Sequence, residues 1–310
     1  MKYVKRFYNL LKSALLEFNR DNAIKLSASL SYYTIFSLAP LLIIIISLCG
    51  FFFGRAAVEG KVYRQLKGLV GPAASLQIED IIRNIQQSKH TVAGAVIGFA
   101  ILLVGATGVF TEIQGSINYI WNINAKPKKG WLKLLINRLL SFSLVVALSF
   151  VLMVSLIVSA AMDLLSDKLK AYFAHVTVYF LYMVNMALVL VIITSLFTVI
   201  FKVLPDARIR WRDAIYGAIF TALLFLLGKV LIGVYLGNSS IGLTYGASAS
   251  VIIILTWVYY SSIILYFGAE FTKVYALRHG GGITPGSNAV YIVKRETREI
   301  PTEPQDQPGE

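Results

Sequence analysis

Residues 176–201 read VTVYFLYMVNMALVLVIITSLFTVIF, and this stretch decides the fold class. It contains no Asp, Glu, Lys or Arg. A helix needs about 20 mostly apolar residues to cross a bilayer core of roughly 30 Å, because each residue rises about 1.5 Å. A helix in a soluble core rarely runs this far without a charged residue. The stretch therefore predicts a membrane-spanning α-helix.

Five further stretches meet the same test, and Lys229 is the only charged residue in any of the six. The predicted spans are residues 26–54, 91–111, 139–162, 176–201, 214–236 and 247–269. The whole chain agrees with this pattern, because 57% of its residues are hydrophobic and only 15% are charged. Soluble domains are about one quarter charged. We expect an all-α polytopic membrane protein with a six-span domain over residues 26–272.

The distribution of Lys and Arg predicts the orientation of the chain. Lys and Arg outnumber Asp and Glu by 29 to 16. Most of them fall in residues 1–25, 112–138, 202–213 and 270–310, which all lie on one side if the chain crosses six times. Cytoplasmic loops carry the excess of Lys and Arg, so both termini are predicted to be cytoplasmic. This placement explains the net charge of +13 without a nucleic-acid partner.

Three segments outside the spans have their own patterns. Residues 1–25 predict an amphipathic helix, lying either in the headgroup plane beside anionic lipid or, alternatively, on the inner loops as a soluble helix. Its apolar residues recur every three or four positions: Val4, Phe7, Leu11, Leu15 and Phe18, with Glu17 and the lysines largely opposite. The outer loop 55–90 predicts two short amphipathic helices. Residues 273–310, rich in Gly, Pro and charge, predict a disordered cytoplasmic tail.

Patterns that would indicate an enzyme are missing from the sequence. His90, His175 and His279 are far apart, and the single cysteine, Cys49, lies in an apolar run. The sequence has no paired His or Cys spacing for a metal, no phosphate-binding loop and no nucleophile elbow. We therefore expect no catalytic residues, no metal and no cofactor.

The ionisable and polar residues near the spans suggest a transport pathway. Lys229 is predicted to lie about 10 Å inside the outer end of its span. It serves either as a fixed positive site for an anionic headgroup or solute, or as a structural lysine whose stem snorkels outward. The first span has a polar inner half followed by Pro40, a residue that commonly kinks a helix. The polar half either lines a transport site at the kink or only forms hydrogen bonds to neighbouring helices. The candidate pathway residues are Tyr32, Tyr33, Ser37, Pro40, Asn185, Lys229 and Tyr245.

Two acidic residues come directly after predicted spans that descend to the cytoplasm. They are Glu112, after span 91–111, and Glu270, after span 247–269. We expect structural ion pairs between them and the basic inner loops. The candidate partners are Arg138, Arg208, Arg210 and Arg212. Gly94 with Gly98 and Gly233 with Gly237 form GxxxG pairs, which permit close packing within the bundle or a homo-oligomer.

The sequence also resembles the YihY/BrkB family of bacterial inner-membrane proteins over roughly residues 15–275. The resemblance begins with KLSASLSYYTIFSLAP at residues 25–40. It continues through Asn118, Trp121, Leu204-Pro205, Asp213, Ala214, Gly217, Gly228-Lys229, Tyr235, Tyr245-Gly246, Trp257 and Gly268-Ala269-Glu270. It implies a six-span, multi-pass protein of the bacterial inner membrane.

Members of that family have carried the label ribonuclease BN. A ribonuclease needs placed acid–base groups or a metal at a water-accessible site, and the few ionisable residues here are scattered over both membrane faces. The first hypothesis is therefore a transporter or flippase-like handler of a lipid or small anionic compound. The alternative is a non-transporting envelope scaffold that binds an unknown protein partner.

Overall fold

The computed structural model describes residues 2–36, 108–126, 176–238, 245, 249–287 and 289–293. The long helices are α1 (Lys2–Arg20), α7 (Val176–Val203), α8 (Trp211–Gly237) and α10 (Ala249–Arg278). Residues 23–36 and 108–120 are also helical. The short strands are β1 (Ile123–Ala125), β2 (Ala207–Arg208), β3 (Thr284–Pro285) and β4 (Ala289–Tyr291). The predicted span 139–162, most of spans 26–54 and 91–111, and the loop 55–90 lie outside the described residues.

Three of the described helices are long and apolar enough to cross a membrane. Their apolar segments are Met186–Val203 in α7, Trp211–Leu236 in α8 and Val251–Arg278 in α10. They coincide with the predicted spans 176–201, 214–236 and 247–269. Large apolar side chains remain exposed along them, including Val191, Leu227 and Val251. Exposed apolar surface on long uncharged helices is typical of segments that face lipid.

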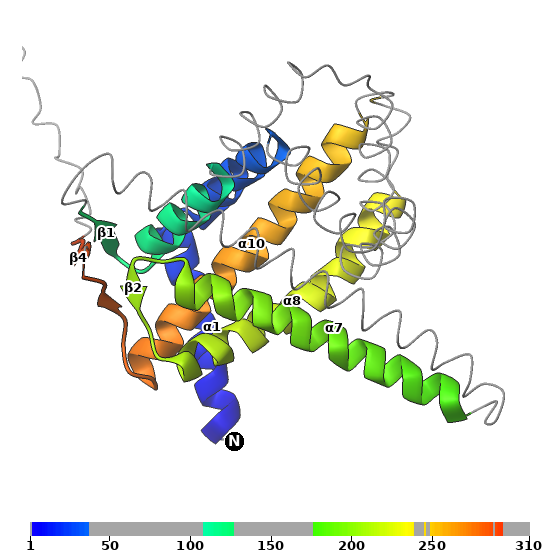
Figure 1. Cartoon of the computed structure of the whole chain (residues 1–310), viewed down its shortest axis with the longest axis horizontal. Helices are drawn as coiled ribbons and strands as arrows, with labels where there is room; N and C mark the ends of the chain where they lie inside the picture. The colour runs from blue at the N-terminus through cyan, green and yellow to red at the C-terminus, as the bar shows by residue number, and fades with distance from the viewer. Residues whose placement is uncertain are drawn as a thin grey trace, which may run out of the picture.

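Helix α8 contacts both α7 and α10, and small residues set its distance from α10 (Figure 1). A Cβ atom added to Gly217 would overlap Thr272, and one added to Gly268 would overlap Thr221. Each threonine hydroxyl donates a 2.7 Å hydrogen bond back to its own helix, Thr221 to the Gly217 carbonyl and Thr272 to the Gly268 carbonyl. The two helices therefore pack with a glycine of each against a threonine of the other, as close helix contacts in membranes require.

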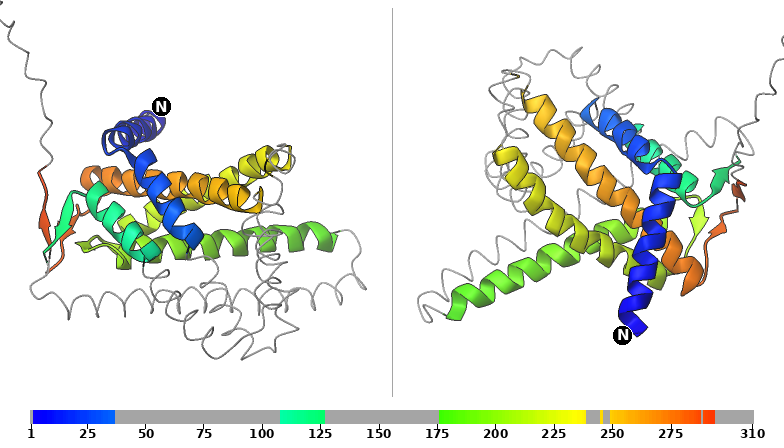
Figure 2. Two further views of the ribbon diagram at one scale, coloured as in Figure 1. Left: turned by 90° about the horizontal axis from the view of Figure 1, so that it is seen from above. Right: turned by 180° about the vertical axis from the view of Figure 1, so that it is seen from behind.

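Helix α1 packs across α10, with a face that only partly coincides with the predicted one (Figure 2). Leu10, Ala14 and Phe18 are buried, whereas Val4 and Leu15 are exposed. Of the predicted stripe, Phe18 is buried, Leu11 packs against the α1–α10 core and the ring of Phe7 contacts that of Phe271, so the prediction is correct in part. The helix stops at a turn in which Asn22 has a φ of 51°. Asparagine tolerates this left-handed conformation better than most residues.

The chain after α10 is ordered as far as Val293, which corrects the prediction of a disordered tail from residue 273. Helix α10 continues to Arg278, β3 pairs with β2, and β4 pairs with β1. In register, Arg208 faces Thr284 and Asn124 faces Val290. These strands are two or three residues long, so they exist only with their partners. Residues 294–310 lie outside the described part of the chain.

The buried core runs through the end of the molecule where these segments meet. It joins Phe18 of α1, Ile117 and Trp121 of the 108–126 segment, Phe201 of α7 and Ile283 beyond α10. The Trp121 indole nitrogen donates a 3.1 Å hydrogen bond to the Ala269 carbonyl. The segments predicted to share the cytoplasmic side are therefore packed together at one end of the helices.

Candidate functional site

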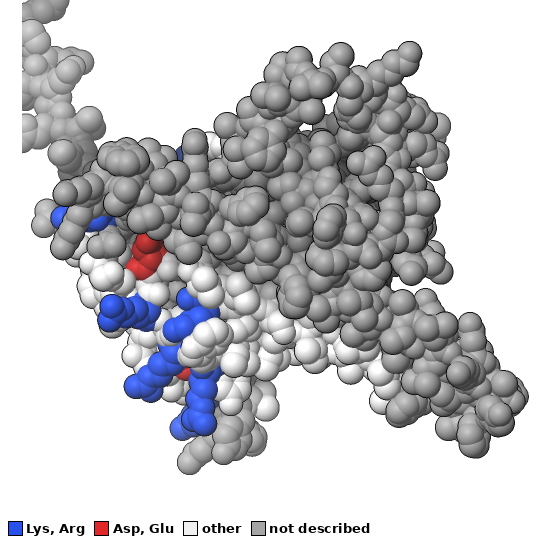
Figure 3. All heavy atoms as spheres, viewed as in Figure 1, with Lys and Arg blue, Asp and Glu red and all other residues white. Residues whose placement is uncertain are grey.

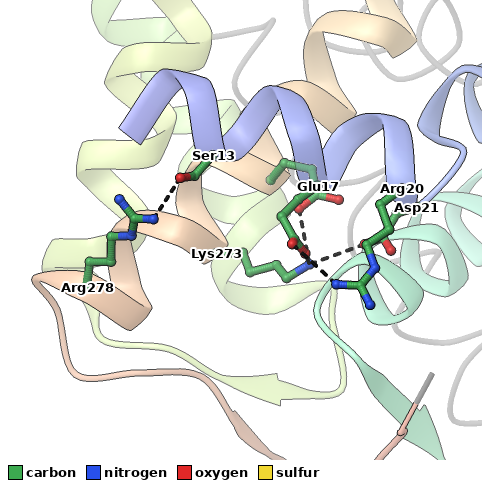
Figure 4. Close-up of polar contacts among 7 residues, drawn as sticks. Ser13, Glu17, Arg20, Asp21, Lys273 and Arg278 are labelled. Atoms are coloured by element: carbon green, nitrogen blue, oxygen red, sulfur yellow. Dashed lines mark hydrogen bonds and ion pairs between the residues drawn. The ribbon is translucent and has the colours of Figure 1, made fainter. Parts of the chain in front are cut away.

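A cluster of charged side chains lies where α1 crosses α10 (Figure 4). The Lys273 ammonium donates hydrogen bonds to Glu17 Oε2 at 2.9 Å, Asp21 Oδ2 at 3.2 Å and Glu270 Oε2 at 3.2 Å. Its three N–H groups are thus matched by three carboxylate oxygens. We call these four residues, Glu17, Asp21, Glu270 and Lys273, the acid–lysine cluster.

Local helix geometry brings the members of the cluster together. Glu270 and Lys273 are three residues apart on α10, and this spacing places them on one face of the helix. Glu17 is on the last turn of α1, and Asp21 follows immediately after that helix. The Asp21 backbone nitrogen donates to the Glu17 carbonyl at 2.8 Å, which continues the helical spacing by one residue. The crossing of the two helices then closes the cluster.

The cluster is buried unevenly. The side chains of Asp21, Glu270 and Lys273 are 2%, 0% and 6% exposed, whereas that of Glu17 is 33% exposed. Glu17 also lies 3.9 Å from the guanidinium of exposed Arg20. Burying charges is costly unless they are paired and hydrogen-bonded. Lys273 is therefore the central cation of two buried carboxyl groups and one at the rim.

One buried atom of the cluster has no hydrogen-bond partner among the described residues. It is the Oε1 oxygen of Glu270, while the Oε2 oxygen of the same side chain accepts from Lys273. An ionised carboxylate spreads its charge over both oxygens, and a buried acceptor without a donor is uncommon in native proteins. The ion pairs with Lys273 therefore account for the Oε2 oxygen of Glu270 but leave its Oε1 oxygen without a hydrogen-bond donor.

Among the described residues, one group of carboxylates is close enough together to suit a metal ion. Its members are Glu17, Asp21 and Glu270, each with an oxygen within 4.8 Å of the others. The Lys273 ammonium, however, already contacts an oxygen of each of them. A metal on the same oxygens would lie beside a positive charge. We therefore assign these carboxylates to Lys273 and not to a metal.

Two further aspartates hold the loops at this end of the molecule. Asp206 Oδ2 accepts hydrogen bonds from Gln114 at 3.0 Å and Asn118 at 2.9 Å. Buried Asp213, in the first turn of α8, accepts a 2.9 Å bond from the Gly281 backbone N–H. A side chain at Gly280 would collide with the Asp213 carboxylate. These contacts fix the 108–126 segment against the loop between α7 and α8, and the chain after α10 against the first turn of α8.

Basic side chains gather on the surface of the same end (Figure 3). The exposed ones include Lys5, Arg6, Arg208, Arg210 and Arg212. The three predicted loop arginines therefore face outward. Glu270 pairs instead with Lys273 of its own helix, which corrects the predicted partner. Glu112 is half-buried, and Arg138 lies outside the described residues.

The predicted pathway residues are spread over several elements. Tyr32 and Tyr33 are exposed on the helix at 23–36, and their ring centroids are 6.0 Å apart. Lys229 is half-buried on α8, next to the point where Gly228 lets Tyr260 of α10 approach. Exposed Tyr245 precedes α10. Asn185 is on α7, with a side chain outside the described set, as are Ser37 and Pro40.

Sequence reasoning missed three of the four residues of the acid–lysine cluster as site residues. Lys273 was placed in the tail, and Glu17 was placed on the aqueous side of the first helix. A usable signal was present, because Glu17 and Asp21 are four residues apart and Glu270 and Lys273 three apart, which is the spacing of neighbours on one helix face. Nothing in the sequence indicated that two pairs about 250 residues apart would meet.

Comparison with known proteins agrees with the membrane character of the helices. A family model described as virulence factor BrkB matches residues 14–291. A UPF0761 membrane protein of Psychromonas ingrahamii is 26% identical over 277 residues, covering 88% of this chain and 89% of that protein. One from Vibrio vulnificus is 25% identical, covering 82% and 78% respectively. One from Saccharophagus degradans is 28% identical, covering 88% and 60%. No solved structure matches the chain.

Proposed function

We propose, on the premise that this chain belongs to the virulence factor BrkB family and is an integral membrane protein, that it moves a lipid or small anionic compound within or across the membrane. The proposal includes six spans, both termini in the cytoplasm, and a place in the bacterial inner membrane. It also holds that the protein is not an enzyme and needs no cofactor.

Lys229 is the observation that carries this proposal. It lies eight residues before the end of α8 at Gly237, about 12 Å along the helix axis. The neighbouring side chains Leu227 and Val230 are both 59% exposed, so Lys229 stands on an apolar segment that suits lipid. Charged residues at such depth usually mark a pathway or a ligand site. A lysine in this setting favours an anionic headgroup or solute.

The basic surface at the other end of the helices supports the same ligand class. Arg208, Arg210 and Arg212 are exposed near the start of α8, and Lys5 and Arg6 are exposed on α1. Lys and Arg near a membrane surface attract anionic lipid, by about 1 kcal/mol each. Anionic lipids are therefore the partners that we propose, and nucleic acid is not among them.

Gly233, with open space around it among the described residues, supports self-association through the Gly233–Gly237 pair.

Native mass spectrometry in nanodiscs of phosphatidylethanolamine and phosphatidylglycerol tests the proposal. The wild type is compared with Lys229→Ala and with Lys229→Arg, which keeps the positive charge. We expect an anionic lipid or metabolite to remain on the wild type and on Lys229→Arg and to be lost from Lys229→Ala. Equal retention of bulk lipid by all three proteins would contradict a ligand site at Lys229.

A scaffold that binds a protein partner is the alternative, and β4 favours it. Tyr291 is 58% exposed and Val293 is 81% exposed, on a segment that is anchored by strand pairing. An ordered, exposed apolar strand end is a common docking element. The scaffold hypothesis predicts that Val293→Asp abolishes the cellular phenotype and that Lys229→Ala leaves it intact. The transport hypothesis predicts the reverse.

A further inference from the structure

The acid–lysine cluster has more buried negative than buried positive charge. Glu17 is at the rim and has Arg20 beside it, so its charge is balanced there. The interior then holds two carboxyl groups, those of Asp21 and Glu270, and one ammonium, that of Lys273. If both carboxyl groups were ionised, the cluster's own ammonium would compensate only one of their two charges, at less than 3% side-chain exposure. An uncompensated buried charge is strongly unfavourable.

Among the described elements packed around Glu270, Lys273 is the only cation that contacts its carboxyl group. From α1 and its turn, the charged groups are Glu17, Arg20 and Asp21. On α10 itself, the cation is Lys273, which is already shared among three carboxylates. Helix α8 meets α10 here through Gly217, Phe220 and Thr221, and the 108–126 segment through Trp121, all of them uncharged.

The unpartnered oxygen of Glu270 shows where the balancing charge belongs. Oε2 accepts from Lys273, whereas Oε1 is buried without a donor. Carboxylate oxygens of Asp21 and Glu270 lie within 4.8 Å of one another. Two carboxyl groups that share a site rarely both ionise, and one of them then retains a proton. A proton needs no space and does not have to compete with the Lys273 ammonium for a position.

We propose that the acid–lysine cluster is a proton-binding site, in which Glu270 carries one proton on its carboxyl group beside ionised Asp21. The bound proton neutralises the interior of the cluster and keeps α1 packed on α10. Loss of the proton places two like charges across that contact and weakens it. Proton binding is thereby coupled to the docking of α1. This site is independent of the transport proposal, because Lys229 is on another helix and toward its far end.

Carbodiimide labelling tests the site in the full-length protein in nanodiscs. Dicyclohexylcarbodiimide adds to a protonated carboxyl group: the acid proton moves to a carbodiimide nitrogen, and a carboxyl oxygen bonds to the central carbon. The product rearranges to a stable acylurea, which peptide mass spectrometry detects. We expect label on Glu270 at neutral pH and complete loss of that label in Glu270→Gln.

Asp21→Asn provides the discriminating variant. With the like charge removed, Glu270 should ionise against Lys273, so its label should fall although the side chain is unchanged. If Glu270 is labelled equally in Asp21→Asn and the wild type, the shared-proton arrangement is wrong. A metal seen in native spectra, with label that grows only after chelation, would also overturn the proposal.

Infrared spectroscopy covers the case in which the reagent does not reach the cluster. A protonated carboxyl group has a carbonyl band separate from that of a carboxylate. The difference spectrum between the wild type and Glu270→Gln should contain one such band. If both the label and the band are absent, Glu270 is ionised and the proposal is refuted. Lipid retention at Lys229 is measured separately, so the two proposals fail independently.

Discussion

The close packing of α8 on α10 predicts that Gly217→Ala destabilises the protein. The added Cβ would overlap Thr272 Oγ1 most closely and lie 2.8 Å from Thr272 Cβ and 2.9 Å from its Cγ2, and real Cβ contacts essentially never fall below 3.0 Å. Thr272 cannot turn away freely, because its hydroxyl donates to the Gly268 carbonyl at 2.7 Å. Overpacking of this kind costs about 1–3 kcal/mol. Alanine recovers about 0.5–1 kcal/mol of helix propensity, so the net loss is at most about 2.5 kcal/mol and centres at about 1 kcal/mol.

Gly115→Ala is the matched control, because Gly115 is exposed on the helix at 108–120 and a Cβ there meets no atom of the described residues within 4 Å. This change should be neutral or stabilising by up to about 1 kcal/mol. Thermal unfolding in detergent, followed by tryptophan fluorescence, should place Gly217→Ala below the wild type and Gly115→Ala at or above it. Thr272→Ala in the Gly217→Ala background should restore part of the loss, because it removes both the Oγ1 and the Cγ2 atom that the added Cβ would meet. If the two alanine variants melt together, the interlocked contact is wrong.

Three further changes test other parts of the structure. Lys273→Met leaves buried carboxyl groups without their cation and should lower the free energy of unfolding by about 3–5 kcal/mol at neutral pH. The loss should be smaller at low pH, where the acids protonate, and thermal unfolding measures both values. A loss of stability that grows on acidification would contradict the pairing. Asp213→Ala leaves the Gly281 N–H without its acceptor, at a cost of about 1–3 kcal/mol, and should speed hydrogen exchange at 280–293 but not in α7. Leu16→Cys, made in a Cys49→Ser background, gives an exposed site on α1 for a spin label. If α1 lies in the headgroup plane, the label should be more accessible to oxygen than to a water-soluble nickel chelate. Equal accessibility to the two reagents would refute that placement.

The membrane character of the helices could be predicted from sequence because it depends on composition within one segment. The stretch 176–201 needs no partner to be recognised as a span, and α7 occupies it. The close packing of Gly217 and Gly268 is different, because each glycine matters only through a threonine on the other helix. Similarity to a family supplied several of these positions as motif residues without their contacts.

The errors share a physical cause, which is that the missed contacts join segments far apart in the chain. Strand β4 has three residues and is ordered through β1, more than 160 residues away. A stretch of three residues is too short to carry a strand signal of its own. The buried face of α1 could be predicted only in part for a similar reason: Leu10 and Ala14 are inside because α10 covers them, whereas Leu15 is no less apolar and stays outside.

The two ends of the described helices differ in a way that bears on mechanism. Near Glu270 the helices are joined by the acid–lysine cluster, by Asp206 with its side-chain donors and by Asp213 with Gly281. Lys229 lies toward the other end of α8, among exposed apolar side chains. Side-chain bonds that span several segments resist relative movement, whereas apolar helix surfaces in lipid slide at little cost. If the protein moves a ligand past Lys229, the fixed end therefore serves as the base about which α8 and α10 change position. The release of a proton from Glu270 would then act on that base, through α1, and not on the ligand itself.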